Sequence, residues 1–428
     1  MPTINLKYGK SQISFDYDEN QFEILESAQE KSALSDAELS EKFDDPIGSK
    51  PLEELINSGE TVLIVVPDAT RNVACASIVN LLVRRLIANG TQPFEINIIF
   101  ATGIHRRVTE DEKREILSPF IVQRIKILDH KAKDLMQIAG LDSKHFTNFG
   151  EWNGIPIELN RVLSEFDHTI IVGGISFHYF AGFTGGRKLI CPGLASEKTI
   201  SATHALAFDC ETKSRRENVG TGILKGNAVH EAFIEVAKHA KPTFSFNTIV
   251  NEHGEATEMF CGDWIAAHET ACEFYAAENT IEIGEKRDLV IVSCGGFPFD
   301  INLIQAHKAL ESASNACADG GTIIFLAECG DGLGRNDFLE WFSAESSANL
   351  AEKLCRNYQV NGQTAWSLLK KAERFQIKII TSLSESETQQ MCLEKIDSLD
   401  KILSEISKSE KGYIIPFGAK NFITNRVS

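Results

Sequence analysis

The sequence predicts an α/β protein with two domains, and three observations support this prediction. Short runs of apolar and β-branched residues recur along the chain, and each run ends at glycine or polar residues. Helical stretches lie between these runs, an alternation typical of parallel sheets covered by helices. At 428 residues the chain is too long for one compact core, which indicates two domains.

The individual elements follow from these patterns. The runs that we expect to form strands are 61–66, 95–100, 169–174, 288–293, 321–327 and 377–382, and the helical stretches include 73–88, 109–118, 229–239 and 302–318. The segment "TINLKYGKSQISFDY" alternates polar and apolar residues, which predicts an antiparallel hairpin that caps one sheet edge.

A charged helical span, 264–288, is expected to link the two domains. We therefore expect an N-terminal α/β domain over 1–275, rejoined by the tail 408–428, and a C-terminal α/β domain over 285–405.

Composition narrows the functional classes. The formal net charge of −17 argues against binding to nucleic acid or to an anionic membrane surface, because both need basic patches. The chain has no basic start followed by an apolar run and no apolar stretch of about 18 residues, so we expect a cytoplasmic protein without a membrane span. The ten cysteines are scattered without a C-x-x-C pair, which predicts reduced thiols.

Reactive side chains follow three of the expected strands directly. "PDATR" provides Asp68 and Arg71, and "ATGIHRR" provides His105. The third strand leads into "GGISFHYFAGFTGGRKLICPG", which contains His178 and Lys188. Ligands of parallel α/β sheets bind at the carboxyl ends of the strands, so these three loops together predict a site.

Each residue also has an ordinary structural interpretation. Asp68 is equally compatible with a helix N-cap, and a lone His105 is more often a loop residue. "TGGRK" lacks the spacing of a Walker loop, although its paired glycines can present N–H groups to an anion. Arg187 with Lys188 would form a local cationic island in an acidic chain.

Two further segments contribute candidates. His204 lies in "SEKTISATHALAF", which predicts a helix after a turn, and it has no second histidine three or four residues away. A metal bound there would need most of its donors from elsewhere, for example from a cofactor. In "INLIQAHKALESA", Gln305 and Lys308 are three residues apart and share a helical face.

Taken together, these pieces resemble the nickel-dependent lactate racemase family. The matching stretches are "PDATR", "ATGIHR", "HYFAGFTGGRKLICPG", "TH" at 203–204 and "QAHK" at 305–308, in the family's order and over nearly the whole chain. The resemblance implies two α/β domains with an active-site cleft between them. It also implies an isomerase that racemises or epimerises lactate or another short-chain 2-hydroxy acid.

The resemblance further implies a nickel-pincer nucleotide, the Ni(II) complex of pyridinium-3-thioamide-5-thiocarboxylic acid mononucleotide, as cofactor. Lys188 resembles the lysine that carries it covalently, with Thr184, Gly185 and Gly186 in the adjoining cofactor-binding loop. His204 resembles the single protein ligand of nickel. Cofactor-assembly enzymes are then expected partners, beside the small-molecule 2-hydroxy acid.

His105 and His178 resemble the two acid/base histidines of the family. The positions that resemble its substrate-binding residues are Arg71, Asp68, Gln305 and Lys308. In the implied reaction one histidine takes the hydroxyl proton, the C2 hydrogen leaves as hydride to the pyridinium ring, and a 2-keto acid forms. Ile304 stands where we would expect an aromatic residue in relatives that act on lactate, which leaves the substrate open within this class.

Two other interpretations compete with this one. The first is a hydrolase or lyase with a protein-bound divalent metal held by His105, His178 and His204. The second is a non-catalytic sensor of a hydroxy acid or of a phosphorylated metabolite.

Overall fold

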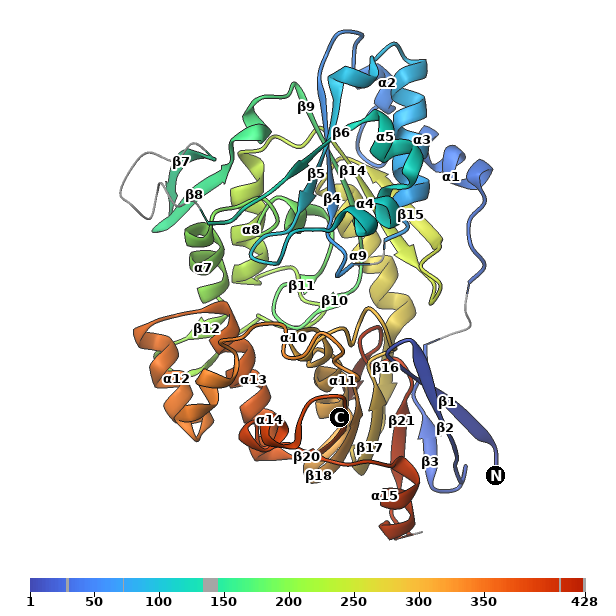
Figure 1. Cartoon of the computed structure of the whole chain (residues 1–428), viewed down its shortest axis with the longest axis vertical. Coiled ribbons are helices and arrows are strands. Elements are labelled where there is room, and N and C mark those ends of the chain that lie inside the picture. The colour runs from blue at the N-terminus through green and yellow to red at the C-terminus, as the bar shows by residue number, and fades with distance from the viewer. Residues whose placement is uncertain (28–30, 72, 134–144, 408, 426–428) are drawn as a thin grey trace. The chain divides into compact units, whose positions relative to one another are not determined.

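The computed structural model describes residues 1–27, 31–71, 73–133, 145–407 and 409–425, and within it the chain forms two compact units (Figure 1). We call residues 29–207 with 217–275 the N-terminal unit. Residues 1–28, 208–216 and 276–428 form the C-terminal unit. The chain therefore enters the C-terminal unit briefly at 208–216 before it returns.

The N-terminal unit is built on a six-stranded sheet. Its strand order is β15-β14-β9-β4-β5-β6, and all neighbouring pairs are parallel except β14 with β15. The strands are β4 (Val62–Pro67), β5 (Ile96–Ala101), β6 (Lys126–Asp129), β9 (His168–Gly174), β14 (Phe244–Val250) and β15 (Ala256–Gly262). Three of them confirm the expected strands at 61–66, 95–100 and 169–174.

Burial explains the composition of these strands. Every residue of β4 is buried, as expected for a central parallel strand that helices cover on both faces. Ile64 and Val66 belong to one apolar cluster with Ile78 and Leu82 of α3 (Cys75–Ala88). Figure 1 shows α3 and α8 (Ala228–Lys238) on opposite sides of this sheet.

Helix boundaries of this unit follow local capping chemistry. α4 (Glu110–Leu117) begins with a capping box between Thr109 and Glu112, and Asn227 caps α8 through the N–H groups of Val229 and His230. The other helices are α1 (Asp36–Asp44), α2 (Leu52–Leu55), α5 (Pro119–Arg124), α7 (Glu197–Ala205) and α9 (Ala266–Asn279), with 3-10 turns η1 (Pro93–Glu95), η2 (Arg161–Ser164) and η3 (Gly186–Leu189). Two antiparallel pairs complete it, β7 (Phe146–Trp152) with β8 (Ile155–Asn160) and β10 (Phe177–His178) with β11 (Gly182–Phe183).

The C-terminal unit has a second six-stranded sheet, in which every neighbouring pair is parallel. Its order is β20-β19-β18-β17-β21-β3. The strands are β3 (Phe22–Ile24), β17 (Arg287–Ser293), β18 (Cys317–Leu326), β19 (Gln376–Ile380), β20 (Glu394–Lys395) and β21 (Gly412–Ile415). β17, β18 and β19 confirm the three expected strands of this region.

Helices and shorter pairs surround this second sheet. The helices are α10 (Leu303–Ala306), α11 (Ala309–Ala316), α12 (Ser347–Arg356), α13 (Val360–Arg374), α14 (Glu385–Gln390) and α15 (Leu399–Glu405), with the 3-10 turn η4 (Leu339–Ala344). The pairs are β1 (Thr3–Tyr8) with β2 (Ser11–Asp16), β12 (Phe208–Asp209) with β13 (Ser214–Arg215), and β16 (Thr280–Ile283) with β22 (Phe422–Asn425). The expected helix 302–318 is divided into α10 and α11 at His307 and Lys308.

The expected N-terminal hairpin forms, but it covers a face of a sheet rather than an edge. Leu6 and Phe15 of the hairpin share an apolar cluster with Leu289 and Ile291 of β17. Val290 and Val292 point to the opposite face and pack in the other core of the unit. Strand alternation therefore gives this sheet two separate apolar faces, and the hairpin covers one of them together with α15.

The grouping of the chain differs from the boundaries expected from sequence. The tail strand β21 pairs with β17 and with β3, so it extends the C-terminal sheet instead of returning to the N-terminal one. Residues 1–28 also belong to the C-terminal unit. Short strands at the ends of a chain carry no sequence signal for which sheet they join, since any exposed parallel edge can accept them.

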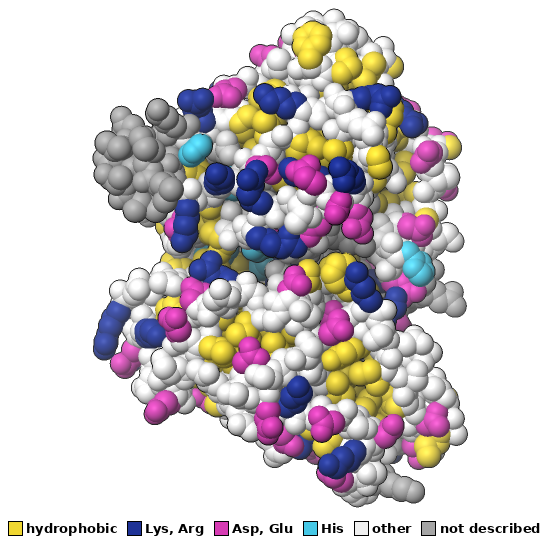
Figure 2. All heavy atoms as spheres, in the orientation of Figure 1, with side chains coloured by type: hydrophobic (Ala, Val, Ile, Leu, Met, Phe, Trp, Pro, Cys, Tyr) yellow, Lys and Arg dark blue, Asp and Glu magenta, His cyan; other side chains and the backbone are white. Residues whose placement is uncertain are grey.

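The surface of the protein carries charges of both signs. On the face in Figure 2 acidic side chains lie among the basic ones over both units. In the described part of the chain no helix has the length and apolar character that a membrane crossing requires.

One expectation about the cysteines is wrong. Cys210 and Cys355 form a disulfide, with Cα atoms 5.6 Å apart, while the other eight cysteines are free. The bond ties the short excursion 208–216 to α12, and Lys213 adds an ion pair with Glu352 of the same helix. Sequence spacing could not indicate this pair because 145 residues separate its members.

We expect alkylation of the unfolded, unreduced chain to label eight of the ten cysteines, and reduction to expose Cys210 and Cys355. The disulfide closes a long loop and so restricts the unfolded chain. Its loss in Cys355→Ser should therefore reduce the free energy of unfolding by roughly 2–4 kcal/mol. Mass spectrometry and thermal melts measure both effects. Cys392→Ser, which removes an exposed free thiol, is the control. Ten labelled cysteines before reduction would contradict the pairing.

Candidate functional site

The N-terminal sheet brings three reactive loops to one edge. β9, β4 and β5 are adjacent and parallel, so the segments after their carboxyl ends leave the sheet side by side. These segments carry Asp68, His105 and the loop from His178 to Lys188. The predicted convergence of the three loops therefore follows directly from strand order.

Asp68 and His105 form a close carboxylate–imidazole pair. His105 Nδ1 lies 2.7 Å from Asp68 Oδ2, and the other carboxylate oxygen accepts the Thr70 N–H at 3.0 Å and the Thr70 hydroxyl at 2.6 Å. Asp68 thus stabilises its own turn and orients the histidine instead of capping α3. The carboxylate is buried, whereas the His105 side chain is 41% exposed.

Charge keeps this carboxylate ionised. Burial raises the pKa of Asp68, but His105 nearby, the Thr70 hydroxyl bond and Arg71 together lower it to about 2. At neutral pH Asp68 therefore accepts a hydrogen bond from His105 Nδ1–H. This tautomer directs His105 Nε2 away from Asp68 as the nitrogen that can exchange a proton.

Backbone hydrogen bonds connect the His105 loop to the Lys188 loop. The Gly103 N–H donates to the Gly193 carbonyl at 2.9 Å, and the Gly193 N–H donates to the Lys188 carbonyl at 3.0 Å. A Cβ on Gly193 would lie 2.2 Å from the Leu189 carbonyl oxygen, so only glycine fits this junction. The two loops are therefore held in fixed positions relative to each other.

His178 lies in the tight hairpin of β10 and β11 and is buried. Its Nδ1 accepts the Ala181 N–H at 3.3 Å, and its ring meets the Phe180 ring edge-on at 4.4 Å between centroids. With Nδ1 as an acceptor, the neutral ring carries its proton on Nε2.

Lys188 and His204 share the same aromatic walls. The Lys188 ammonium lies 5.6 Å from the ring centres of both Phe180 and Phe233. The His204 ring lies 5.2 Å from Phe180 and 5.3 Å from Phe233. Because Phe180 also contacts His178, one phenyl ring packs against all three candidate residues of this region.

His204 is held as a neutral imidazole with one nitrogen fixed. Its Nδ1–H donates to the Ile200 carbonyl at 2.7 Å, within α7, which Ser196 caps as the predicted turn-then-helix requires. Burial, with Lys188 and His105 nearby, lowers the pKa of His204 to about 3. A neutral ring whose Nδ1 is engaged presents Nε2 as its donor, the form that a metal ligand needs.

The expected cationic island of Arg187 and Lys188 does not form. Arg187 is completely buried, and its guanidinium donates to the carbonyls of Ala181 at 2.7 Å, Thr184 at 3.3 Å and Gly185 at 3.4 Å. Burial lowers the pKa of Arg187 to about 10, which still leaves it charged at neutral pH. The residue organises the turn before Lys188 and does not face a ligand.

His268 completes the surroundings of Arg187. Its Nε2 lies 2.8 Å from Arg187 Nη1, and burial and the arginine hold the pKa of His268 well below its usual value. A neutral His268 accepts from Arg187 through Nε2, so the Thr184 carbonyl takes its hydrogen bond from Arg187 instead. The positive charge of Arg187 also acts on His230, and burial together with this charge lowers the pKa of His230 to about 3.

The remaining cofactor-loop candidates have structural roles of their own. The Thr184 hydroxyl donates to the Gly174 carbonyl at 2.7 Å and accepts the Ser176 N–H at 2.8 Å. Gly185 and Gly186 have φ values of +74° and +48°, and a Cβ on Gly186 would collide with His268. These residues shape the loop that presents Lys188.

The substrate candidates divide between the units. Arg71 follows β4 and its charge acts on Asp68. Gln305 and Lys308 belong to the C-terminal unit, where the Lys308 ammonium donates to the Gln305 side-chain oxygen. The expected common helix is interrupted between them, because α10 ends at Ala306 and Lys308 precedes α11. Ile304 is half-buried and packs against the core of the same unit.

The donor set fits a group that brings most of its own ligands. Among the described residues no three His, Cys, Asp or Glu side chains are grouped so that they could hold a metal ion. His105, His178 and His204 therefore do not form a protein-only metal site. A lysine amine and one neutral imidazole against common phenyl walls suit a tethered organic cofactor that carries a metal.

Sequence reasoning missed three residues of this region. Phe180 stands inside a quoted stretch, but nothing in its spacing distinguishes it from a core residue. Phe233 lies on α8 and His268 on α9, which the sequence indicated only as amphipathic or linking helices. His268 reaches Thr184 across 84 residues, so no local pattern could have revealed the contact.

The chain is similar to known proteins over most of its length. Residues 8–216 match the family model described as lactate racemase N-terminal domain, and residues 283–415 match lactate racemase C-terminal domain. The chain is 32% identical to the lactate racemase of Thermoanaerobacterium thermosaccharolyticum over 80% of its length and 78% of the relative. It is 34% identical to that of Lactiplantibacillus plantarum over 79% of its length and 77% of the relative.

Solved structures show the same fold. The lactate racemase apoprotein of Thermoanaerobacterium thermosaccharolyticum superimposes with a TM-score of 0.86 at 28% identity, covering 99% of this chain and all of that one. A Thermotoga maritima protein at 19% identity gives a TM-score of 0.69, covering 93% of this chain and all of its own, and shares the fold.

Buried neutral histidines predict that the chain loses stability in acid. His230 in the unfolded chain binds a proton below pH 6.5, but the folded chain does not bind it until about pH 3, so the unfolded state gains as pH falls through this window. His230→Phe should flatten the dependence of unfolding free energy on pH by about 1.4 kcal/mol per unit between pH 6 and 4. Denaturant titrations of metal-free protein measure the slope. His253→Gln, at an exposed position, should leave it unchanged, and equal slopes in all three proteins would contradict the prediction.

Proposed function

The chain belongs to the lactate racemase family, a family of isomerases, and we propose that it racemises a short-chain 2-hydroxy acid with a nickel-pincer nucleotide carried on Lys188. The family relationship supports 2-hydroxyacid racemisation as the class of reaction. The substrate within this class, the cofactor and the roles of individual residues are our proposal.

The observation that carries the proposal is the placement of Lys188 and His204. Both side chains contact Phe180 and Phe233, so a group attached to the lysine amine would remain within the surroundings of the imidazole. Lys188 would anchor the cofactor, and His204 Nε2 would complete the coordination of its nickel. When bound, this cofactor supplies an acceptor for the hydride at C2 of the substrate.

Proton transfer falls to His105 and His178. Asp68 orients His105 through Nδ1 and stays ionised, so His105 Nε2 can take the substrate hydroxyl proton and return it. His178 would serve the opposite enantiomer; since its Nδ1 accepts the Ala181 N–H at 3.3 Å, it would have to take the substrate proton at this nitrogen in place of that hydrogen bond. Two separately fixed imidazoles match a reaction whose two directions need a base on different faces of the substrate.

Substrate binding needs cationic and amide groups. Arg71 would hold the carboxylate, because a guanidinium fork matches two oxygens. Gln305 and Lys308 are already hydrogen-bonded to each other and would contact the carboxylate or hydroxyl as a preformed pair. Ile304 offers no phenol-type hydrogen bond, so we propose that short aliphatic 2-hydroxy acids are preferred to dicarboxylic ones.

The alternatives find less support. A divalent-metal hydrolase or lyase would need a donor set that the described residues do not provide. A non-catalytic hydroxyacid sensor would need neither a lysine tether nor the ionised Asp68 behind His105.

We expect protein from a host that assembles the cofactor to carry a covalent nucleotide mass that Lys188→Ala abolishes, because this amine is the tether. His204→Ala should keep the organic mass and lose nickel, since it removes one metal ligand only. Intact-mass and metal analysis of the same samples separate the two effects. Lys198→Ala, an exposed lysine ten residues along, is the control and should retain both. Full cofactor mass on Lys188→Ala would rule out the attachment site.

The fate of the C2 hydrogen tests the reaction itself. In ordinary water, racemisation of a C2-deuterated 2-hydroxy acid should retain most of the label, because hydride transferred to carbon does not exchange with solvent. A proton taken by histidine would exchange rapidly, since N–H groups equilibrate with water. Mass spectrometry of both enantiomers during turnover measures the label. Loss of deuterium at the rate of racemisation would refute the hydride route.

A further inference from the structure

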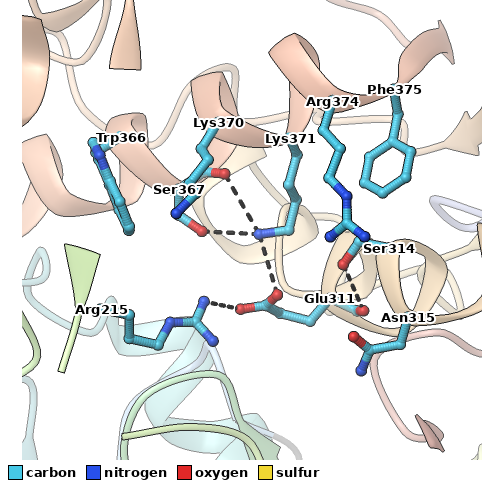
Figure 3. A pocket seen from close by; sticks show the side chains of 10 residues that line it. All are labelled: Arg215, Glu311, Ser314, Asn315, Trp366, Ser367, Lys370, Lys371, Arg374 and Phe375. Carbon is cyan, nitrogen blue, oxygen red and sulfur yellow. Dashed lines mark hydrogen bonds and ion pairs between the residues drawn. The ribbon is translucent and has the colours of Figure 1, made fainter. Parts of the chain in front are cut away.

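The C-terminal unit contains a pocket of about 290 Å³ between α11 and α13 (Figure 3). Arg215 reaches into it from β13, and Glu311, Ser314 and Asn315 line it from α11. The remaining lining comes from α13 and the residue after it: Trp366, Ser367, Lys370, Lys371, Arg374 and Phe375. The lining includes neither Gln305 nor Lys308, so its interpretation does not depend on the proposed function.

Positive charge dominates this pocket. Four cations line it, Arg215, Lys370, Lys371 and Arg374, against the single carboxylate of Glu311. Arg374 also forms an ion pair with Asp319, whose side chain is 74% exposed. Even with Asp319 included, the pocket keeps an excess of two positive charges, in a chain whose net charge is −17.

The inner part of the pocket is a triad of Arg215, Glu311 and Lys371. Glu311 pairs with Arg215 and, at 3.2 Å, with the Lys371 ammonium, which also donates to the Ser367 hydroxyl at 2.9 Å. The side chains of Lys371 and Glu311 are only 9% and 13% exposed. Two cations therefore lie against one carboxylate in a largely desolvated place, where a bound anion would interact with both at low solvent screening.

The outer part of the pocket adds accessible cations. Lys370 is exposed, and its ammonium lies 5.0 Å from the centre of the Trp366 ring. In the part of the chain that the structure describes, no carboxylate pairs with Lys370. Arg374 is 44% exposed at the same rim. These two side chains can close on a ligand that enters from solvent.

We propose that this pocket binds a phosphoryl dianion, either inorganic phosphate or a small phosphate monoester. A phosphate group carries about −1.5 to −2 charges at neutral pH, which matches the excess of the lining. Arginine forks, lysine point charges and serine hydroxyls are the groups that bind its oxygens. The volume leaves room for a small organic part beside the phosphate.

Calorimetric titration of the purified full chain at low ionic strength tests this inference, with inorganic phosphate and glycerol phosphate as separate probes. We expect saturable binding of at least one probe, weakened by added sodium chloride because screening reduces the attraction. Tighter binding of glycerol phosphate would identify the monoester as the better ligand, and tighter binding of phosphate the free ion. Absence of binding by both at millimolar concentrations would overturn the proposal.

Variants locate the binding. Lys370→Gln and Arg374→Gln should each raise the dissociation constant roughly tenfold, the effect of one lost charge-assisted hydrogen bond. Both positions are exposed, so the substitutions leave the core intact. Lys353→Gln is the matched control, since Lys353 lies 4.6 Å from the Trp341 ring centre but outside the pocket. Equal weakening by the control, or displacement of phosphate by lactate, would overturn the assignment.

Discussion

The buried guanidinium of Arg187 is the interaction on which the candidate site depends. A charge taken out of water must be compensated by hydrogen bonds, and here three carbonyl oxygens and the neutral His268 provide them. Those carbonyls belong to the turn that precedes Lys188, so the need to satisfy one arginine determines the path of the turn. These acceptors serve Nη1 and Nη2, while the buried Nε–H has no acceptor among the described residues. A path of the turn that removed the carbonyls would leave further buried donors unsatisfied, at a cost of about 1–3 kcal/mol for each.

Strand order then places this turn beside the other reactive loop. β9 and β5 both pair with β4, and the Gly193 hydrogen bonds connect the two loops beyond the sheet edge. His105 receives its orientation from Asp68 in the loop between them. Strand order therefore brings the loops together, and hydrogen bonds orient the individual side chains within them. Arg187, which fixes the path of a loop, is fully buried, whereas the candidate acid/base residue His105 is 41% exposed.

Much of this could be predicted from the sequence, and the rest could not for identifiable reasons. Apolar runs predicted six of the parallel strands, β4, β5, β9, β17, β18 and β19, because strands buried on both faces have a distinctive composition. They did not predict β14, which is parallel to β9 and also largely buried. The reactive residues after strands were found for the same reason. The direction of the Arg187 side chain was not predictable, since adjacent residues in a turn can point to opposite sides. The Cys210–Cys355 pair and the sheet that β21 joins depend on contacts between distant segments, which leave no local pattern.

The surroundings of Lys188 also explain how a cation and a potential metal ligand coexist. Burial alone would keep His204 neutral, and the positive charge of Lys188 disfavours its protonation further. Phe180 and Phe233 pack against the buried His204 and the half-buried Lys188, and their ring faces attract the ammonium through cation–π interaction. An exposed lysine and histidine at the same spacing would be hydrated, and the histidine would be partly protonated near neutral pH. The rings of Phe180 and Phe233 therefore make the lysine and the imidazole suitable for holding one tethered group. Carboxylates in their place would pair with the lysine and would stabilise the protonated form of the histidine.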